Sequence, residues 1–303
     1  MIEVNKIASL TGHQNPIYAL EASKKPGIIF TAGNDKGIVE WSLKRMEFIK
    51  VLMPVPTSVY SLHALSFAPI LASGERSGRV NIFDFEQQRV TAVFNHHNKP
   101  VFALASINQK RELLASSEDG TVSVVDPVNN NLLYNFQVSK EMVRCIAVSP
   151  DEKLVAFGCK DNLIRVYNVD DYSFVTEING HTLPITSLSF SPDGNRLLSG
   201  SRDAQLKIWN VSDFNLIENI AAHLFAIYDI KFHASLPYFA TASQDKSIKI
   251  WDSETFKLRK IISREKGYES HSHSINKIIW DAETGNLIST GDDKAVILWE
   301  VKF

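Results

Sequence analysis

The chain has 303 residues, of which 44% are hydrophobic and 22% are charged, and its formal net charge is −2. This composition is that of an ordinary globular protein and excludes an intrinsically disordered chain. The near balance of Lys and Arg with Asp and Glu argues against bulk attraction to nucleic acid or to an anionic membrane surface.

The N-terminal segment has no basic start followed by an apolar run and no small-residue cleavage site, so we expect no signal peptide. No stretch approaches the roughly 18 apolar residues that a membrane helix needs. Cys145 and Cys159 are too few for a disulfide framework, and both stand in apolar surroundings, which is typical of buried thiols in a reducing compartment. These features predict a cytoplasmic protein.

From residue 13 onward the chain is an internal repeat. Seven related segments run from a turn residue, usually Asp, to an aromatic or apolar residue six positions later, as in Asp203–Trp209 and Asp245–Trp251. These segments end at Trp41, Phe83, Val125, Tyr167, Trp209, Trp251 and Trp299, a spacing of 42 residues five times and then 48. Self-similarity at such a period indicates a repeat architecture.

Each repeat also has a constant interior. A His precedes the turn Asp by 22 residues in five of the repeats, and an apolar residue follows that His by four, as at Ile17 and Ile227. Alternating runs such as Leu206–Trp209 are typical of strands, and pairs such as Asp193-Gly194 are typical of turns. Four short antiparallel strands per unit of about 42 residues make a propeller blade. The sequence thus predicts an all-β, single-domain, seven-bladed β-propeller over residues 1–303, with blades near 13–54, 55–96, 97–138, 139–180, 181–222, 223–270 and 271–303.

The repeat resembles the WD-repeat (WD40) family. The Gly-His signature of that family stands at Gly12-His13 and Gly180-His181, and its Trp-Asp signature stands at Trp251-Asp252. The resemblance covers essentially the whole chain. Repeats two to four keep the spacing but lack the Trp, and repeat two also lacks the Asp and the His, so we expect three degenerate blades that depend more on packing.

The segment before the first repeat predicts how the ring closes. The last repeat reaches only four residues beyond Trp299, where the other repeats continue through one more strand. Residues 6–13 match that strand, as seen in 174–181. We therefore expect residues 1–12 to be the outer strand of the last blade and to pair with Ala295–Val301, which leaves no open end to the array.

Four repeats contain a His, a Ser or Thr, an Asp and a Trp at constant spacing. These residue types suggest a hydrolase triad, but four copies of a nucleophilic site in one small protein would be strange. The resemblance to WD-repeat proteins implies a structural hydrogen-bond tetrad instead, in which the Trp N–H finds the acceptor that it needs when buried. The four sets are His13, Thr31, Asp35 and Trp41; His181, Ser199, Asp203 and Trp209; His223, Thr241, Asp245 and Trp251; and His271, Ser289, Asp293 and Trp299.

Other chemistry is weakly indicated. The pair His271 and His273 has strand-like spacing for a metal, but His271 belongs to a tetrad and no third ligand is evident. His97 of the pair His96-His97 aligns with the blade histidines. No phosphate-binding glycine loop is present. We predict no catalytic residues, no metal and no cofactor.

Propellers bind partners on the loops at one end of the channel. In WD-repeat proteins, which this chain resembles, the favoured positions lie three and five residues after the blade His and immediately before the turn Asp. The positions five after are Tyr18, Tyr60, Phe102, Arg144, Thr186, Tyr228 and Asn276. The positions three after are Pro16, Ser58, Pro100, Met142, Pro184, Ala226 and Ser274. The positions before the turn are Asn34, Arg76, Glu118, Lys160, Arg202, Gln244 and Asp292.

Two groups stand out in this map. The first is an aromatic arc over blades 6, 1, 2 and 3, which consists of Tyr228, Tyr18, Tyr60 and Phe102. Its one interruption is blade 7, where Asn276 occupies the corresponding position. The second group is a basic sector that surrounds Glu118 and consists of Arg76, Arg144, Lys160 and Arg202. Aromatic and Arg side chains dominate interface energetics. We predict a non-enzymatic, monomeric scaffold that binds a protein or an acidic, partly hydrophobic peptide across the channel mouth on this top face.

Two alternatives remain open from the sequence. One is a lactonase-like or hydrolase-like propeller with a metal in the channel, for which Asn34, Glu118, Asn276 and Asp292 would supply ligands. The other is binding of RNA or a phosphopeptide through the basic sector, which steep salt dependence would reveal. The extra residues near 264–270, between blades six and seven, predict either a mobile flap beside the aromatic arc or a neutral insertion.

Overall fold

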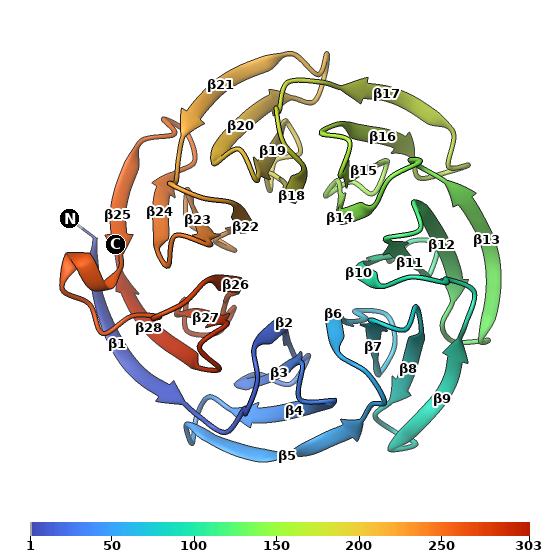
Figure 1. Cartoon of the computed structure of the whole chain (residues 1–303), viewed down its shortest axis with the longest axis horizontal. Helices are drawn as coiled ribbons and strands as arrows, with labels where there is room; N and C mark the ends of the chain where they lie inside the picture. Colours follow the sequence, from blue (N-terminus) through green and yellow to red (C-terminus); the bar gives the residue numbers. More distant parts are fainter. Residues whose placement is uncertain (1) are drawn as a thin grey trace.

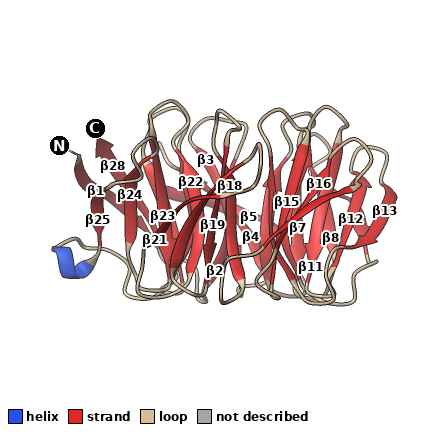
Figure 2. Ribbon diagram, turned by 90° about the horizontal axis from the view of Figure 1, so that it is seen from above, coloured by secondary structure: helices blue, strands red, loops and turns tan. Residues whose placement is uncertain are grey.

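The ring has seven four-stranded antiparallel sheets arranged around a central channel (Figure 1). A computed structural model describes residues 2–303; Met1, the first residue of the predicted strand over 1–12, lies outside the described residues. Within each sheet the strands follow one another from the channel to the circumference, and seen edge-on the ring is a disc one strand deep (Figure 2). The prediction of a seven-bladed propeller is confirmed.

The first four blades follow the 42-residue spacing. Blade 1 consists of β2 (Ile17–Ala22), β3 (Ile28–Gly33), β4 (Gly37–Ser42) and β5 (Glu47–Pro54). Blade 2 consists of β6 (Val59–Ala64), β7 (Ile70–Glu75), β8 (Val80–Asp84) and β9 (Arg89–Phe94). Blade 3 consists of β10 (Val101–Ile107), β11 (Glu112–Ser117), β12 (Thr121–Asp126) and β13 (Asn131–Gln137). Blade 4 consists of β14 (Val143–Val148), β15 (Leu154–Cys159), β16 (Ile164–Asn168) and β17 (Phe174–Ile178).

The remaining blades repeat this plan. Blade 5 consists of β18 (Ile185–Phe190), β19 (Arg196–Ser201), β20 (Gln205–Asn210) and β21 (Leu216–Ala221). Blade 6 consists of β22 (Ile227–Phe232), β23 (Tyr238–Ser243), β24 (Ile248–Asp252) and β25 (Leu258–Ile262), and a 3-10 turn, η1 (Arg264–Lys266), follows it. Blade 7 consists of β26 (Ile275–Trp280), β27 (Leu287–Gly291), β28 (Val296–Lys302) and the N-terminal strand β1 (Glu3–Leu10).

The ring closes through β1. This strand pairs antiparallel with β28, with Val4 opposite Val301 and Leu10 opposite Val296, which confirms the predicted partner. Val4 and Leu10 are buried. Because the first and last segments of the chain share one sheet, opening the ring would expose apolar side chains and an unpaired strand edge.

The turn between the second and third strands has the same backbone in every blade. The residue after the turn Asp, or after its equivalent, adopts a positive φ in all seven: Lys36, Gly78, Gly120, Asn162, Ala204, Lys246 and Lys294. These turns lie on the same face as the connections between blades, and we call this the top face. In Figure 2 it is directed downward, on the side of η1. No helix in residues 2–303 has the length and apolar character needed to cross a membrane.

The core is divided among the interfaces between blades. Each of seven clusters of buried apolar residues joins two neighbouring sheets, as where Trp209 of blade 5 packs with Val166 of blade 4. In blades 2 to 4 the Trp position is taken by other buried residues, namely Phe83, Val125 and Tyr167. The channel can therefore stay open, because no core runs through the centre of the ring.

Candidate functional site

The residue five places after the blade His is a β-bulge in all seven blades. In each innermost strand the pairing register shifts across this one residue, for example between Ile17 and Ala19 around Tyr18. A bulge inserts an unpaired residue and re-aims its side chain. The seven side chains line a channel cavity of about 610 Å³: Tyr18, Tyr60, Phe102, Arg144, Thr186, Tyr228 and Asn276.

Three of the four aromatic side chains of this set are in contact. The ring centroids of Tyr18 and Tyr60 are 5.3 Å apart, and those of Tyr60 and Phe102 are 5.1 Å apart. The guanidinium of Arg144 lies 4.3 Å from the centroid of Phe102. Three members of the aromatic arc thus form a continuous row that ends on the Arg144 cation, over blades 1 to 4. The fourth member, Tyr228, lines the same cavity from blade 6. Cation–π contact of this kind favours the charged guanidinium.

Arg144 is a cation without an anionic partner. Within residues 2–303 no carboxylate forms an ion pair with it. Burial, and to a smaller extent the charge of Arg202, lower the pKa of Arg144, although a guanidinium remains protonated in proteins. A desolvated charge is costly unless it is paired. The position therefore favours a ligand that brings a carboxylate or another anion.

Two other channel positions are used within the ring itself. The amide nitrogen of Asn276 donates to the carbonyl oxygen of Ile17 and to Asp292, at 2.8 Å each. The hydroxyl of Thr186 donates to the carbonyl oxygen of Ile227 at 2.5 Å. Each of these side chains links its blade to the next one. The side chains left free for a ligand are those of the aromatic arc and of Arg144.

The positions before the turn lie on the rim and not in the channel, apart from Asp292. Arg76, Lys160 and Arg202 are exposed, and Glu118 is half-buried. Lys160 forms an ion pair of 2.9 Å with Glu141 of the neighbouring loop. The basic sector is therefore not one continuous site, and its channel component is Arg144.

The positions three after the His have a backbone role. In every blade the N–H of the residue before the turn donates to the carbonyl oxygen of this position, as from Arg202 to Pro184 at 2.9 Å and from Asn34 to Pro16 at 3.1 Å. This bond fixes the turn against the loop between blades. These positions therefore require only a residue whose backbone can adopt this geometry, and the bond does not depend on the type of side chain.

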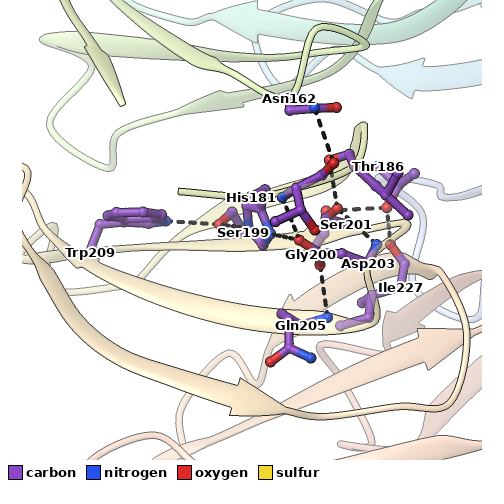
Figure 3. A network of polar contacts seen from close by, with 12 residues as sticks. Asn162, His181, Thr186, Ser199, Gly200, Ser201, Asp203, Gln205, Trp209 and Ile227 are labelled. Atoms are coloured by element: carbon purple, nitrogen blue, oxygen red, sulfur yellow. Dashed lines mark hydrogen bonds and ion pairs between the residues drawn. The ribbon is translucent and has the colours of Figure 1, made fainter. Parts of the chain in front are cut away.

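Figure 3 shows the polar network of blade 5. The indole N–H of Trp209 donates to the hydroxyl of Ser199 at 2.8 Å, and this hydroxyl lies 2.7 Å from Nε2 of His181. Nδ1 of His181 lies 2.9 Å from the carboxylate of Asp203. Asp203 also accepts the backbone N–H groups of Thr182 and Gln205. The four residues are linked in one chain from the interface between blades to the turn.

The same chain of contacts occurs in blades 1, 6 and 7. His13, His223 and His271 lie 2.6, 2.8 and 2.8 Å from their carboxylates and 2.7, 2.7 and 2.8 Å from their hydroxyls. Each hydroxyl also accepts the indole N–H of its Trp, at 2.7 Å from Trp41 and 2.9 Å from both Trp251 and Trp299. The hydroxyl residues are fully buried, so they cannot reach a substrate.

Hydrogen bonds lower the pKa of three tetrad carboxylates, those of Asp203, Asp245 and Asp293. Burial alone would raise the pKa of Asp203, but the hydrogen bonds from His181 and from backbone N–H groups outweigh it and lower the pKa to about 2. In His13 and His223 burial outweighs the attraction of the neighbouring Asp and lowers the imidazole pKa. A neutral imidazole can donate to the Asp and accept from the hydroxyl at the same time.

Blades 2 and 3 contain substitute networks that the sequence pattern did not reveal. In blade 3, His97 lies 3.1 Å from Asp119 and 3.0 Å from the hydroxyl of Ser123, which comes from the third strand and not the second. In blade 2 the fully buried carboxylate of Glu75 accepts from Thr57 at 2.8 Å and from Asn81 at 2.6 Å. Polar links from loop to sheet are therefore retained where the tetrad is absent.

Blade 4 has a third kind of link. Its Ser139, at the His position, donates to Asp161 at 2.8 Å, and Asp161 pairs with Arg165 at 2.8 Å. Arg165 also reaches Glu177 of the outer strand at 3.1 Å. Blades 2 to 4, which we expected to depend more on packing, thus also contain polar links of their own. Sequence reasoning missed these links because it did not consider charged or amide residues within the strands, such as Glu75, Asn81 and Arg165, as substitutes for the tetrad.

A charged cluster, also missed, lines the same channel cavity as the arc. It comprises Glu21, His63, Asp229, Lys231 and Lys277. Burial raises the pKa of Glu21 to about 7, and burial with the charge of Lys231 lowers that of His63 to about 4. Lys277 lies 3.6 Å from Asp229. In the described part of the chain no three His, Cys, Asp or Glu side chains gather closely enough to hold a metal ion.

The insertion near 264–270 lies at the outer edge of the ring, next to β1 (Figure 1), and the prediction that it borders the aromatic arc is wrong. Glu269 pairs with Lys6 of β1 at 3.3 Å, and the ring of Tyr268 packs edge-on against Trp299. Arg264 donates to the carbonyl oxygen of Ser270 at 2.8 Å. These contacts hold the segment against the outer side of blade 7. Its extra residues therefore extend outward and not toward the channel.

Two family models match the chain. The model described as "WD domain, G-beta repeat" matches residues 4–42, 172–210, 214–252 and 263–300, just over half of the chain. These segments contain all the residues of the four full tetrads. The model described as "Anaphase-promoting complex subunit 4 WD40 domain" matches residues 105–183, in blades 3 and 4.

Several curated proteins are similar over part of the chain. U3 small nucleolar RNA-associated protein 12 of Saccharomyces cerevisiae is 23% identical over 59% of this chain and 20% of its own length. WD repeat-containing protein SL1-17 of Schistosoma mansoni is 25% identical, over 53% of each chain. COMPASS component SWD3 of Saccharomyces cerevisiae is 26% identical over 58% of this chain and 64% of its own length. The match thus spans less than two thirds of each of these relatives.

Proposed function

We propose, from the premise that this chain belongs to the WD40 repeat family, that it is a non-enzymatic scaffold whose top face binds an acidic, partly hydrophobic peptide segment of a partner protein. Proteins of this family are typically scaffolds for protein interactions. The segment lies across the channel mouth, with a carboxylate on Arg144 and apolar side chains on the aromatic arc. We also propose that residues 1–303 act as one domain and as a monomer in the cytoplasm.

The proposal rests on one observation, that Arg144 lies in the channel without a carboxylate partner among residues 2–303. Its side chain is half-buried, and its guanidinium lies over the ring of Phe102. An incoming carboxylate would pair with it in a partly dehydrated setting, where charge-assisted hydrogen bonds are strong. The aromatic rings beside it supply rigid apolar area at low entropic cost, as interface anchors do.

A scaffold role is also favoured because the residues that resemble catalytic groups are occupied by hydrogen bonds within the ring. The tetrad hydroxyls are buried, and each is shared between an indole and an imidazole. The turn carboxylates are held by backbone N–H groups. These groups are fully used in holding the ring together, so the free chemistry of the top face is that of recognition.

The test is selection of short random peptides displayed on phage against the full chain, followed by titration of the selected peptides. We expect the enriched peptides to contain Asp or Glu next to bulky apolar residues. We expect Arg144→Gln to weaken their binding about tenfold or more, without lowering the melting temperature, because a desolvated ion pair is lost. Arg89→Gln, in an exposed part of outer strand β9, is the matched control and should leave the affinity unchanged.

The same titration separates the alternatives. Enriched peptides without acidic residues, or equal affinity of wild type and Arg144→Gln, would contradict the proposal. Mixed-sequence single-stranded RNA provides a second probe. If this RNA binds through Arg144 with a steep loss of affinity on addition of salt, the site is one for nucleic acid and the peptide proposal fails.

A further inference from the structure

The seven blades supply an internal comparison for the loops of the top face. The two residues directly after the blade His, or after its equivalent, occupy the same place in each connection. In five blades they are polar or proline: Gln14 and Asn15, Pro56 and Thr57, Asn98 and Lys99, Lys140 and Glu141, and Ser272 and His273. Blade 5 has Leu183 at the second place, and blade 6 has Leu224 and Phe225. The fold therefore does not require apolar side chains here.

These three side chains are exposed to solvent. Leu183 is 47% exposed, Phe225 is 57% exposed and Leu224 is 79% exposed, the largest fraction among the large hydrophobic residues of the described chain. Single exposed apolar residues are ordinary, but a group of them on a rim marks an interaction site. None of the three has a core role that would explain its type.

The three side chains belong to one surface because a single turn joins their loops. The turn of blade 5 binds the first loop through Ser201, whose hydroxyl donates to the carbonyl oxygen of Leu183 at 2.8 Å. It binds the second loop through Ala204, whose carbonyl oxygen accepts the N–H of His223 at 3.3 Å. Leu183, in the connection from β17 to β18, and the Leu224–Phe225 pair, in the connection from β21 to β22, therefore flank this turn. These two connections join blade 5 to its two neighbours (Figure 1).

The charges that remain free around this surface are positive. Arg202 and Lys246 are exposed on the turns of blades 5 and 6, and neither pairs with a carboxylate of residues 2–303. The carboxylates of the same turns, Asp203 and Asp245, are half-buried and are held by the histidines of their tetrads. Arg202 is near enough to Arg144 for its charge to act on that guanidinium. The cationic field thus extends from the apolar surface to the channel.

We propose that Leu183, Leu224 and Phe225 form a second anchor of the same binding site, and that the partner segment places bulky apolar residues there and an acidic residue on Arg144. This inference rests on the proposed function, since it assigns both anchors to one peptide. A peptide fits this arrangement better than a membrane surface does. A flat bilayer would contact the rim loops and could not follow a chain into the channel, where Arg144 and the aromatic arc lie.

The test compares two double variants with the peptides selected on the wild-type chain. Leu224→Ser with Phe225→Ser should weaken binding about tenfold or more, as expected for the loss of an interface anchor. Leu132→Ser with Leu133→Ser is the matched control, since these side chains on outer strand β13 are 44% and 40% exposed. The control should bind like wild type. Melting temperatures of all variants should stay within a few degrees, because the residues are at the surface.

Each outcome decides between the two proposals. If Arg144→Gln weakens binding and the Leu224/Phe225 variant does not, the second anchor is absent and the proposed function stands. If neither variant changes the affinity, both proposals fail. Vesicles of phosphatidylserine and phosphatidylcholine form the last arm. If the wild-type chain sediments with them and the Leu224/Phe225 variant does not, the surface binds membranes and the inference is overturned.

Discussion

At the scale of single residues, Ser199 shows how much of the ring depends on buried hydroxyls. It serves the indole of Trp209 and the imidazole of His181 at once. We expect Ser199→Ala to lower the free energy of unfolding by about 2 kcal/mol or more, since two buried polar groups lose their partner. Ser235→Ala, at an exposed serine whose hydroxyl makes no hydrogen bond within residues 2–303, is the control. Urea unfolding measures both, and equal midpoints would refute the account of the tetrad.

Buried histidines make the stability of the molecule depend on pH. Burial lowers the pKa of His13, His97 and His223 below the value of an unfolded chain. The unfolded state therefore takes up protons first as the pH falls. The stability that these residues contribute is complete above about pH 6.5 and is lost progressively below it. Asp203, with its pKa lowered to about 2, adds a loss only below about pH 4.

This dependence is measured by urea unfolding of the Glu21→Gln variant between about pH 8 and about pH 5, where histidines titrate, because burial raises the pKa of Glu21 to about 7 and its protonation would oppose the effect of the histidines. We expect the midpoint to decrease steadily on acidification through this range. A midpoint that is constant, or that rises toward acid pH, would show that the imidazoles are charged in the folded ring.

The residues of the tetrads could be predicted from sequence because their spacing is constant and their types are distinctive. Glu75 and Arg165 could not, since each replaces the tetrad from a different strand position. Leu224 was missed because its position belongs to no motif of the family. Sequence reasoning finds a role that recurs in several blades and misses one that a single blade has acquired.

At the scale of elements, the turn on the top face of each blade requires a left-handed residue. Gly120 fills this place in blade 3 with φ 85°, and a Cβ there would collide with the carbonyl oxygen of Ser139. Gly27 has a similar φ of 73°, but a Cβ there would meet nothing within 4 Å. The two glycines thus separate backbone strain from steric collision.

We expect Gly27→Ala to cost about 1 kcal/mol from its left-handed backbone alone. Gly120→Ala should cost about 2 kcal/mol more, because the loop between blades 3 and 4 must also move. Thermal or urea unfolding of both variants measures the difference. Equal losses of stability would mean that the turn is not packed against the neighbouring loop as described.

The elements themselves were predictable, whereas their local distortions were not. Strand alternation and turn residues placed the four strands of each blade, and the match of 6–13 to an outer strand predicted the pairing of β1 with β28. The bulge in every innermost strand leaves no mark in the residue pattern, since Tyr, Phe, Arg, Thr and Asn all occupy it. The outward course of the insertion near 264–270 depends on contacts with β1 that lie far away in the sequence.

At the scale of the whole molecule, a constant repeat dictates a closed ring. Each blade buries its faces only against its two neighbours, so seven similar interfaces and the shared sheet of blade 7 hold the disc together. The differences between blades then decide what the ring binds. Three aromatic residues of the arc lie on blades 1 to 3, the cation Arg144 lies on blade 4, and the apolar surface lies on blades 5 and 6, so that these features follow one another around the top face. The spacing predicted the ring, but only the folded structure places these three surfaces around one channel.

The most direct test of the account is a crystal structure of the chain with a peptide selected on it. We predict that a carboxylate of the peptide lies on the guanidinium of Arg144, and that its bulky apolar side chains contact Leu224 and Phe225. A peptide seated on the opposite face, or added to the edge of an outer strand such as β13, would contradict the central claim that the channel mouth on the top face is the binding site.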